Sequence, residues 1–86
     1  MTARTDDEMV LKLIERSRLL IALSEEIPTE TKLQAQPLLK QLEQLMAADD
    51  RDVARIAGTH ALLTRELREF ADLDALLGAM ENFLPR

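Results

Sequence analysis

The sequence predicts an all-α protein, a compact antiparallel bundle of four helices that forms a single domain over residues 1–86. Leu, Ala, Glu, Gln and Arg are abundant and only two glycines occur, a composition that favours helix over nearly the whole length. Apolar residues recur at three- and four-residue spacing, which places them on one face of a helix. The connections between these segments are short, which is typical of antiparallel neighbours.

The first helix is predicted over residues 6–26. Thr5 followed by Glu8 has the pattern of a capping box, so we expect residues 1–4 to be frayed. Pro28 ends this helix, because the residue before a proline is disfavoured in the α region. The apolar stripe comprises Val10, Leu13, Ile14, Ser17, Leu20, Ile21, Ser24 and Ile27.

Pro37 is predicted to interrupt the second helix, since a proline in a helix interior removes a hydrogen bond and clashes with the preceding turn. We expect a short turn at 30–35 and a main helix over 37–48, with Pro37 in its first turn, or a kink there. The stripe of this helix comprises Leu38, Leu39, Leu42, Leu45 and Met46.

The longest helix is predicted over residues 50–71, where no proline occurs, with Asp49 or Asp50 as its cap. Its stripe comprises Val53, Ile56, Ala57, His60, Leu63, Thr64, Leu67, Phe70 and Ala71. The last helix is predicted over 73–84, starting at Asp72 or Asp74. Its stripe comprises Leu73, Leu76, Leu77, Met80, Phe83 and Leu84.

Charge and hydropathy argue against two classes of partner. The formal net charge of −5 and the pI near 4.8 disfavour binding to nucleic-acid phosphates and to anionic lipid. The most apolar run, from Leu19 to Leu23, is too short to cross a membrane. Residues 1–7 lack the apolar core of a signal peptide, so we expect a cytoplasmic protein.

No cofactor or metal is expected, because the chain has no cysteine, one histidine and no glycine-rich phosphate loop. His60 lies at the centre of an apolar stripe and is expected to be a core or interface residue with one hydrogen-bond partner. A pH-sensitive role is the alternative, in which acidification through pH 6 destabilises the fold or a dimer. Ser17 and Ser24 are expected to mark close contacts between helices or to bond back to the preceding turn through their hydroxyls.

Five leucines fall outside the apolar stripes, namely Leu11, Leu19, Leu23, Leu33 and Leu62. Leu19 and Leu23 are one turn apart, which suggests a patch that a partner covers. Burial of one leucine is worth about 1.5–3 kcal/mol, so several could hold a complex together. The pattern favours a non-enzymatic protein–protein interaction module. We expect a small regulatory or inhibitory protein that occludes a partner and is homodimeric.

The alternative is a small all-helical enzyme with an inter-subunit site for an anionic ligand, using Arg16, Arg18 and His60. The segment from Leu13 to Leu20 resembles in composition the opening helix of helical chorismate mutases, which are of this size. That resemblance implies a dicarboxylate site built from several buried Arg or Lys groups. Arg16 and Arg18 fall on the polar side of the first predicted helix, and the last two predicted helices offer no inward cation. The interaction module is therefore the favoured reading.

Overall fold

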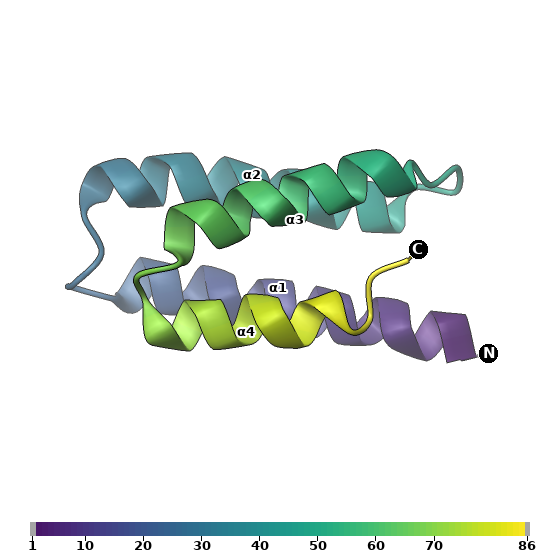
Figure 1. Cartoon of the computed structure of the whole chain (residues 1–86), viewed down its shortest axis with the longest axis horizontal. Coiled ribbons are helices and arrows are strands. Elements are labelled where there is room, and N and C mark those ends of the chain that lie inside the picture. Colours follow the sequence, from purple (N-terminus) through teal and green to yellow (C-terminus); the bar gives the residue numbers. More distant parts are fainter. Residues whose placement is uncertain (1, 86) are drawn as a thin grey trace.

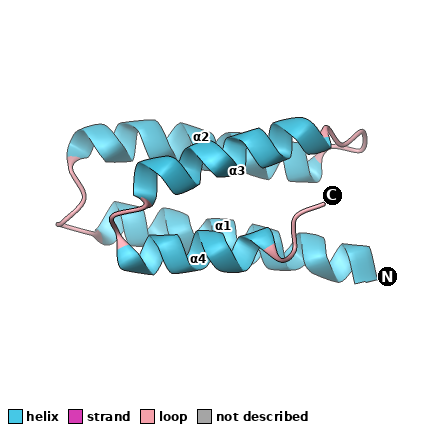
Figure 2. Ribbon diagram, viewed as in Figure 1, coloured by secondary structure: helices cyan, strands magenta, loops and turns pink. Residues whose placement is uncertain are grey.

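Four helices account for most of the chain in a computed structural model that describes residues 2–85, with the side chains of residues 6–85 (Figures 1 and 2). They are α1 (Thr2–Leu23), α2 (Thr29–Ala47), α3 (Val53–Leu67) and α4 (Ala71–Glu81). Successive helices run antiparallel (Figure 1). The predicted all-α bundle of four helices is confirmed.

The helices occupy the four corners of a square in chain order. α1 packs against α2 and α4, and α3 packs against the same two helices. Within residues 2–85 no Cα atom of α1 lies within 8 Å of one in α3, and none of α2 within 8 Å of one in α4, so these pairs lie diagonally opposite. The Cα atoms span 38 × 18 × 16 Å. The outer faces of α1 and α3 therefore point in opposite directions.

Each helix contributes one row of buried side chains to an aliphatic core. The rows are Val10, Ile14, Ser17 and Ile21; Ala35, Leu39, Leu42 and Met46; Ile56, His60, Leu63 and Leu67; and Leu73, Leu77 and Met80. Within each row the spacing alternates between three and four residues, the repeat with which side chains of neighbouring helices interlock in bundles. Phe70 and Phe83 are half-buried at the margin of this core.

The ends of α1 differ from the prediction at both sides. The helix begins at Thr2, so the backbone of residues 2–4 is helical and not frayed, while Met1 lies outside the described residues. Thr5 is inside the helix, which excludes it as the N-cap of a capping box; its side chain is outside the described part. At the other end the helix stops at Leu23, three residues early. The Ser24 hydroxyl accepts the N–H of Glu26 at 3.2 Å, a local turn that replaces further helix.

The predicted separate turn at 30–35 is not observed, because one helix runs from Thr29 through Pro37 to Ala47, and the alternative of a kink at Pro37 stays a prediction. Pro37 has no N–H to donate to the backbone carbonyl of Leu33, which is its usual partner in a helix. Both residues are exposed, and the exposed fraction of Leu33 is 70%. Water can therefore solvate that carbonyl. Ala35 and Leu39, on either side of the proline, are both fully buried and fix the two halves of the helix to one core.

Replacing Pro37 by Ala should raise the free energy of unfolding by about 2 kcal/mol. Proline in a helix interior costs about 3 kcal/mol relative to Ala, and its stiffening of the unfolded chain offsets about 0.4–1 kcal/mol of that. Urea denaturation followed by circular dichroism measures the change. The matched control, Lys40→Ala, alters an exposed position one turn later and should shift stability by less than about 0.5 kcal/mol. An unchanged or lower midpoint for the proline variant would contradict a continuous α2.

The last two helices are also divided differently from the prediction. Asp52 and not Asp49 or Asp50 caps α3, because its carboxylate accepts the N–H of Arg55 at 3.1 Å. The chain leaves the helix after Leu67, and Phe70 adopts an extended conformation before α4 begins at Ala71. Residues 68–70 thus form a turn, whereas the sequence predicts helix there. Three members of the predicted stripe, Val53, Ala57 and Ala71, are exposed, and Thr59 is buried instead.

Candidate functional site

Four of the five leucines outside the predicted stripes are exposed. The exposed fraction is 54% for Leu19, 79% for Leu23, 70% for Leu33 and 49% for Leu62. Leu11 differs, because it is half-buried and packs against the core. The predicted contact set therefore loses Leu11 as a surface residue.

The exposed leucines do not share one surface. Leu62 lies on α3, diagonally opposite the helix that carries Leu19 and Leu23, so it faces away from them. Leu33 lies on α2, which packs directly against α1. Only three of the leucines can therefore contribute to a common contact surface.

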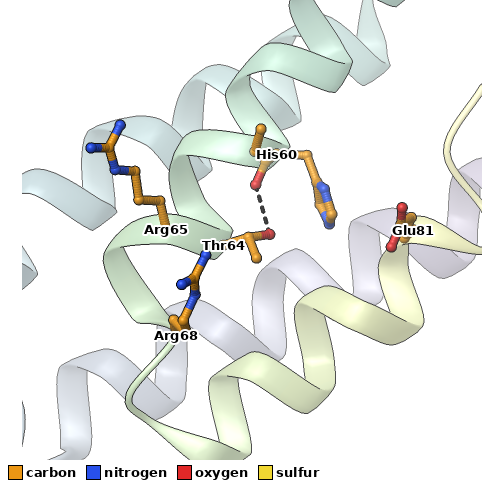
Figure 3. A pocket seen from close by; sticks show the side chains of 6 residues that line it. His60, Thr64, Arg65, Arg68 and Glu81 are labelled. Atoms are coloured by element: carbon orange, nitrogen blue, oxygen red, sulfur yellow. Dashed lines mark hydrogen bonds between the residues drawn. The ribbon is translucent and has the colours of Figure 1, made fainter.

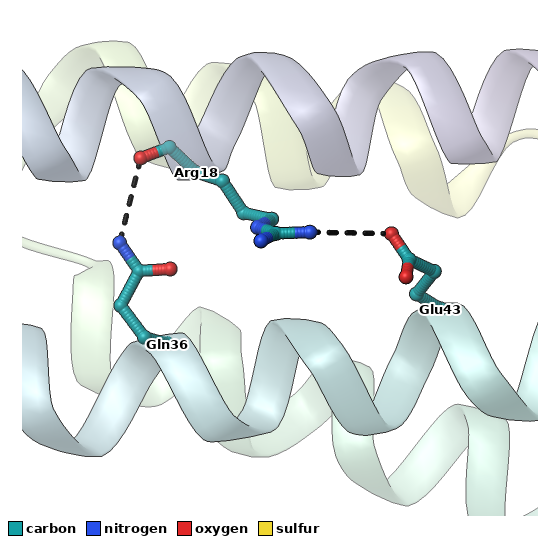
Figure 4. Close-up of polar contacts among 3 residues, drawn as sticks. All are labelled: Arg18, Gln36 and Glu43. Carbon is teal, nitrogen blue, oxygen red and sulfur yellow. Dashed lines mark hydrogen bonds and ion pairs between the residues drawn. The ribbon is translucent and has the colours of Figure 1, made fainter.

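A side-chain contact sets the level of Leu33 relative to α1. The Gln36 Nε2 atom donates to the backbone oxygen of Arg18 at 3.4 Å (Figure 4). The two helices are antiparallel, so a step of one turn towards the start of α2, from Gln36 to Leu33, matches a step of one turn towards the end of α1. That step leads from Arg18 to about residue 22. Leu33 thus lies level with the segment from Leu19 to Leu23. We call Leu19, Leu23 and Leu33 the leucine patch.

A groove between α1 and α2 borders the leucine patch. Its lining comprises Arg18, Lys32, Leu33, Gln36, Pro37 and Lys40. Three of these side chains are cations and none is a carboxylate, so we call it the basic groove. Leu33 belongs to both the patch and the groove.

One carboxylate, that of Glu43, approaches the basic groove from outside its lining. The Arg18 Nη1 atom lies 3.4 Å from the Glu43 Oε2 atom (Figure 4), and both side chains are about two-fifths exposed, at 42% and 41%. A surface ion pair of this kind contributes about 0–1 kcal/mol and is screened by salt. Glu43 therefore weakens but does not abolish the positive charge at this end of the groove.

His60 occupies a second polar region, between α3 and α4. Its ring is buried, and the Nε2 atom lies 2.8 Å from the backbone oxygen of Leu77. A carbonyl can only accept, so the Nε2 atom carries the proton and donates. His60 is thus buried with one partner for its ring, as expected of a core histidine, and an interface role stays a prediction. Its pH sensitivity stays a prediction.

A shallow polar pocket opens beside His60. Thr64, Arg65, Arg68 and Glu81 line it together with His60 and Ala61. The Thr64 hydroxyl donates to the backbone oxygen of His60 at 2.9 Å, and the Arg65 side chain points away from His60 and Glu81 (Figure 3). Glu81 lines the same pocket as Arg68 and would oppose an anion there. This region has no buried cation facing an empty space.

The residues of the enzyme alternative do not come together within one chain. Arg16 is exposed on α1, Arg18 turns towards Glu43 of α2, and His60 lies between α3 and α4. Since α1 and α3 are diagonal, a shared site would need a second subunit. In the part of the chain that the structure describes, no three His, Asp or Glu side chains gather as metal ligands.

Ser17 on α1 and Ser24 directly after it both have structural partners. Ser17 is fully buried, and its hydroxyl donates to the backbone oxygen of Leu13 at 2.8 Å, as predicted. Ser24 differs from the prediction, since its hydroxyl accepts the N–H of Glu26 instead. Neither lies on a helix that contacts α3, the helix of His60.

The structure also joins residues that no local pattern connects. Arg51, in the connection between α2 and α3, forms an ion pair with Asp7 near the start of α1. Its guanidinium also donates to the backbone oxygen of Met46 at 3.4 Å. The hydrogen bond to Asp7 raises the pKa of Arg51 above its ordinary value. This pair joins the first turns of α1 to the connection that follows the C-terminal end of α2.

Sequence reasoning missed the basic groove, although a signal for it exists. Leu33, Gln36, Pro37 and Lys40 recur at three- and four-residue spacing, which places them on one side of a helix. The predicted break at Pro37 divided this row and concealed it. The pairing of the row with Arg18 depends on how α1 and α2 pack.

No helix in the described residues is long and apolar enough to cross a membrane. Comparisons of this chain with protein-family models, with curated proteins and with solved structures found no match. The exposed leucines and the basic groove of α1 and α2 are therefore the basis for the proposal that follows.

Proposed function

We propose that this protein is a non-enzymatic protein–protein interaction module of a regulatory or inhibitory kind. It acts by binding a partner through the leucine patch and covering part of the partner's surface. One observation carries this proposal. Leu23 and Leu33 are 79% and 70% exposed at the same end of two adjacent helices, and they are the two most exposed large apolar side chains in the described residues. Exposed apolar patches of this kind mark contact sites.

The size of the patch bounds what it can do alone. Full burial of three leucines is worth about 4–9 kcal/mol, at about 1.5–3 kcal/mol for each. Association loses about 4–15 kcal/mol of translational and rotational freedom. The patch therefore serves as the apolar centre of an interface, and polar contacts around it must add to the affinity.

The expected homodimer stays a prediction, and the leucine patch is an unfavourable place for it. A two-fold dimer through this surface places the same patch of both protomers face to face. Here it would bring Arg18, Lys32 and Lys40 of one protomer towards the same cations of the other. Like charges across an interface oppose association, so the patch fits a different chain better than a second copy.

The double substitution Leu19→Glu with Leu23→Glu tests the proposal. The tagged protein is purified gently from its own host and its complexes are weighed by native mass spectrometry. We expect a stoichiometric second polypeptide with the parent and none with the double variant. The matched control, Leu62→Glu, changes an exposed leucine on the opposite corner and should retain that polypeptide.

Circular dichroism and urea denaturation accompany this experiment. Both variants should keep the helical content and unfolding midpoint of the parent, because the exposed fraction of the three leucines is 49–79%. Unfolding of the double variant would show that Leu19 and Leu23 belong to the core. Retention of the second polypeptide by a folded double variant would exclude the leucine patch as the contact surface.

A further inference from the structure

We infer that the partner presents an acidic amphipathic helix, which lies in the basic groove with its apolar side on Leu33 and Pro37. This inference rests on the proposed function and specifies the chemistry of the partner. It combines the apolar patch, the charge of the groove beside it and the helical construction of both walls.

The charge of the groove opposes that of the whole chain. The protein carries a formal net charge of −5, yet the groove lining holds Arg18, Lys32 and Lys40 and no carboxylate. Lys32 is half-buried and Lys40 is exposed, so both ammonium groups are within reach of a partner. Positive potential in a groove attracts carboxylates and orients a partner that carries them.

The apolar content of the surface distinguishes a protein helix from other anions. Leu33 and Pro37 form the apolar part of the groove, whereas Leu19 lines a separate hollow on α1 with Met9 and Leu13. A single-stranded nucleic acid is usually bound by aromatic side chains on which its bases stack. The described part of the groove has none. Apolar and acidic groups together are found on an amphipathic helix with Leu or Ile on one side and Glu or Asp beside them.

The construction of the groove favours a helix over an extended strand. Its walls are two helices, whose backbone groups are already paired, so no sheet edge is available for strand addition. The lining residues of α2 follow one another at three- and four-residue spacing along the groove. A helix laid along it would meet them with its own residues at the same spacing.

The test uses three fluorescently labelled probes and the intact protein. The first is a synthetic helical peptide of about 18 residues, with Leu at three- and four-residue spacing flanked by Glu. The second has Lys in place of every Glu. The third is a short DNA duplex. Vesicles of phosphatidylserine and phosphatidylcholine are examined in parallel by co-sedimentation.

We expect the acidic peptide to bind about tenfold or more tightly than the basic peptide, measured by fluorescence anisotropy. Raising the salt concentration should weaken that binding, because the groove is open to solvent and its charges are screened. Lys32→Glu with Lys40→Glu should lower the affinity about tenfold. The matched control, Lys32→Arg with Lys40→Arg, keeps the charge and should bind as the parent does.

Several results would overturn the inference. The first is equal binding of the two peptides, and the second is an unchanged affinity after charge reversal. The third is no binding of the acidic peptide at about 100 μM, a concentration at which even a weak complex would form. The fourth is tighter binding of DNA or vesicles than of the acidic peptide. The native mass spectrometry experiment separates these failures from failure of the proposed function. If Leu19→Glu with Leu23→Glu loses the second polypeptide while charge reversal at Lys32 and Lys40 retains it, the interaction module stands and the acidic helix does not.

Discussion

Replacing Leu63 by Ala should lower the free energy of unfolding by about 3–4 kcal/mol, whereas Leu62→Ala should change it by less than about 0.5–1 kcal/mol. The two leucines are neighbours in the middle of α3, so the intrinsic helix preference changes equally in both variants. Leu63 is fully buried and Leu62 is 49% exposed. The difference between the variants therefore measures packing alone.

The large effect at Leu63 follows from its place in the core. It lies between Ile56 and Leu67 in the buried row of α3, and its removal leaves a cavity as well as losing transfer free energy. In a chain of 86 residues, whose whole stability is expected to be about 5–10 kcal/mol, this is a large share. The Leu63 variant should retain only about 1–7 kcal/mol of stability.

Urea denaturation followed by circular dichroism at several protein concentrations provides the measurement. Equal losses at both positions would contradict the orientation of α3. A loss at Leu62 that grows as the protein concentration rises would show that an oligomer buries this leucine, since association adds stability by mass action. That outcome would locate the predicted homodimer on α3.

The contrast between Leu62 and Leu63 also shows what the sequence could predict. Residues spaced by three and four fall on one side of a helix whatever packs against it, so the apolar stripes and the exposed Leu19, Leu23, Leu33 and Leu62 followed from local pattern. The number of helices and their antiparallel order followed from the short connections. These features need no knowledge of distant residues.

The errors arose where distant packing overrides local preference. Residues 68–70 contain no proline or glycine and favour helix, yet the chain turns there, and Phe70 packs against the core. Pro37 should end a helix, yet burial of Ala35 and Leu39 holds α2 together across it. In both cases contacts between helices outweigh a preference of about 1–3 kcal/mol.

The candidate site shows the same division. Each leucine of the patch could be identified from spacing within its own helix. The proximity of Leu33 to α1, and the meeting of Arg18 with Lys32 and Lys40, depend on the register between two helices. That register is set by core packing and by the contact of Gln36 with Arg18. A single sequence contains no local signal for it.

His60→Ala should lower the free energy of unfolding by about 3 kcal/mol. About 2 kcal/mol comes from removing a buried ring and about 1 kcal/mol from the lost hydrogen bond to Leu77. The hydrogen bond joins α3 to α4, which is only 11 residues long. Such a short helix is not stable by itself and depends on contacts with its neighbours. We therefore expect α4 to be the element most affected.

Three matched variants separate the two contributions. His60→Gln keeps a side-chain N–H donor, and His60→Leu keeps apolar bulk, so each should lose about 1–1.5 kcal/mol. His60→Leu leaves no orphan acceptor, because the Leu77 carbonyl retains its bond within α4. Thr64→Val removes only the hydroxyl that bonds to the backbone of His60 within α3, and should change stability by less than about 0.5 kcal/mol.

Urea denaturation gives the global values, and amide hydrogen exchange shows where the stability is lost. In His60→Ala the amides of α4 should lose protection beyond the global change, while those of α1 and α2 should follow it. A loss below about 1 kcal/mol for His60→Ala would contradict the packing of the ring between α3 and α4. If His60→Leu proved more stable than the parent, a contribution to stability would not explain why position 60 is a histidine. Its polar ring would then have a role other than stability, and the predicted pH sensitivity would be the next property to measure.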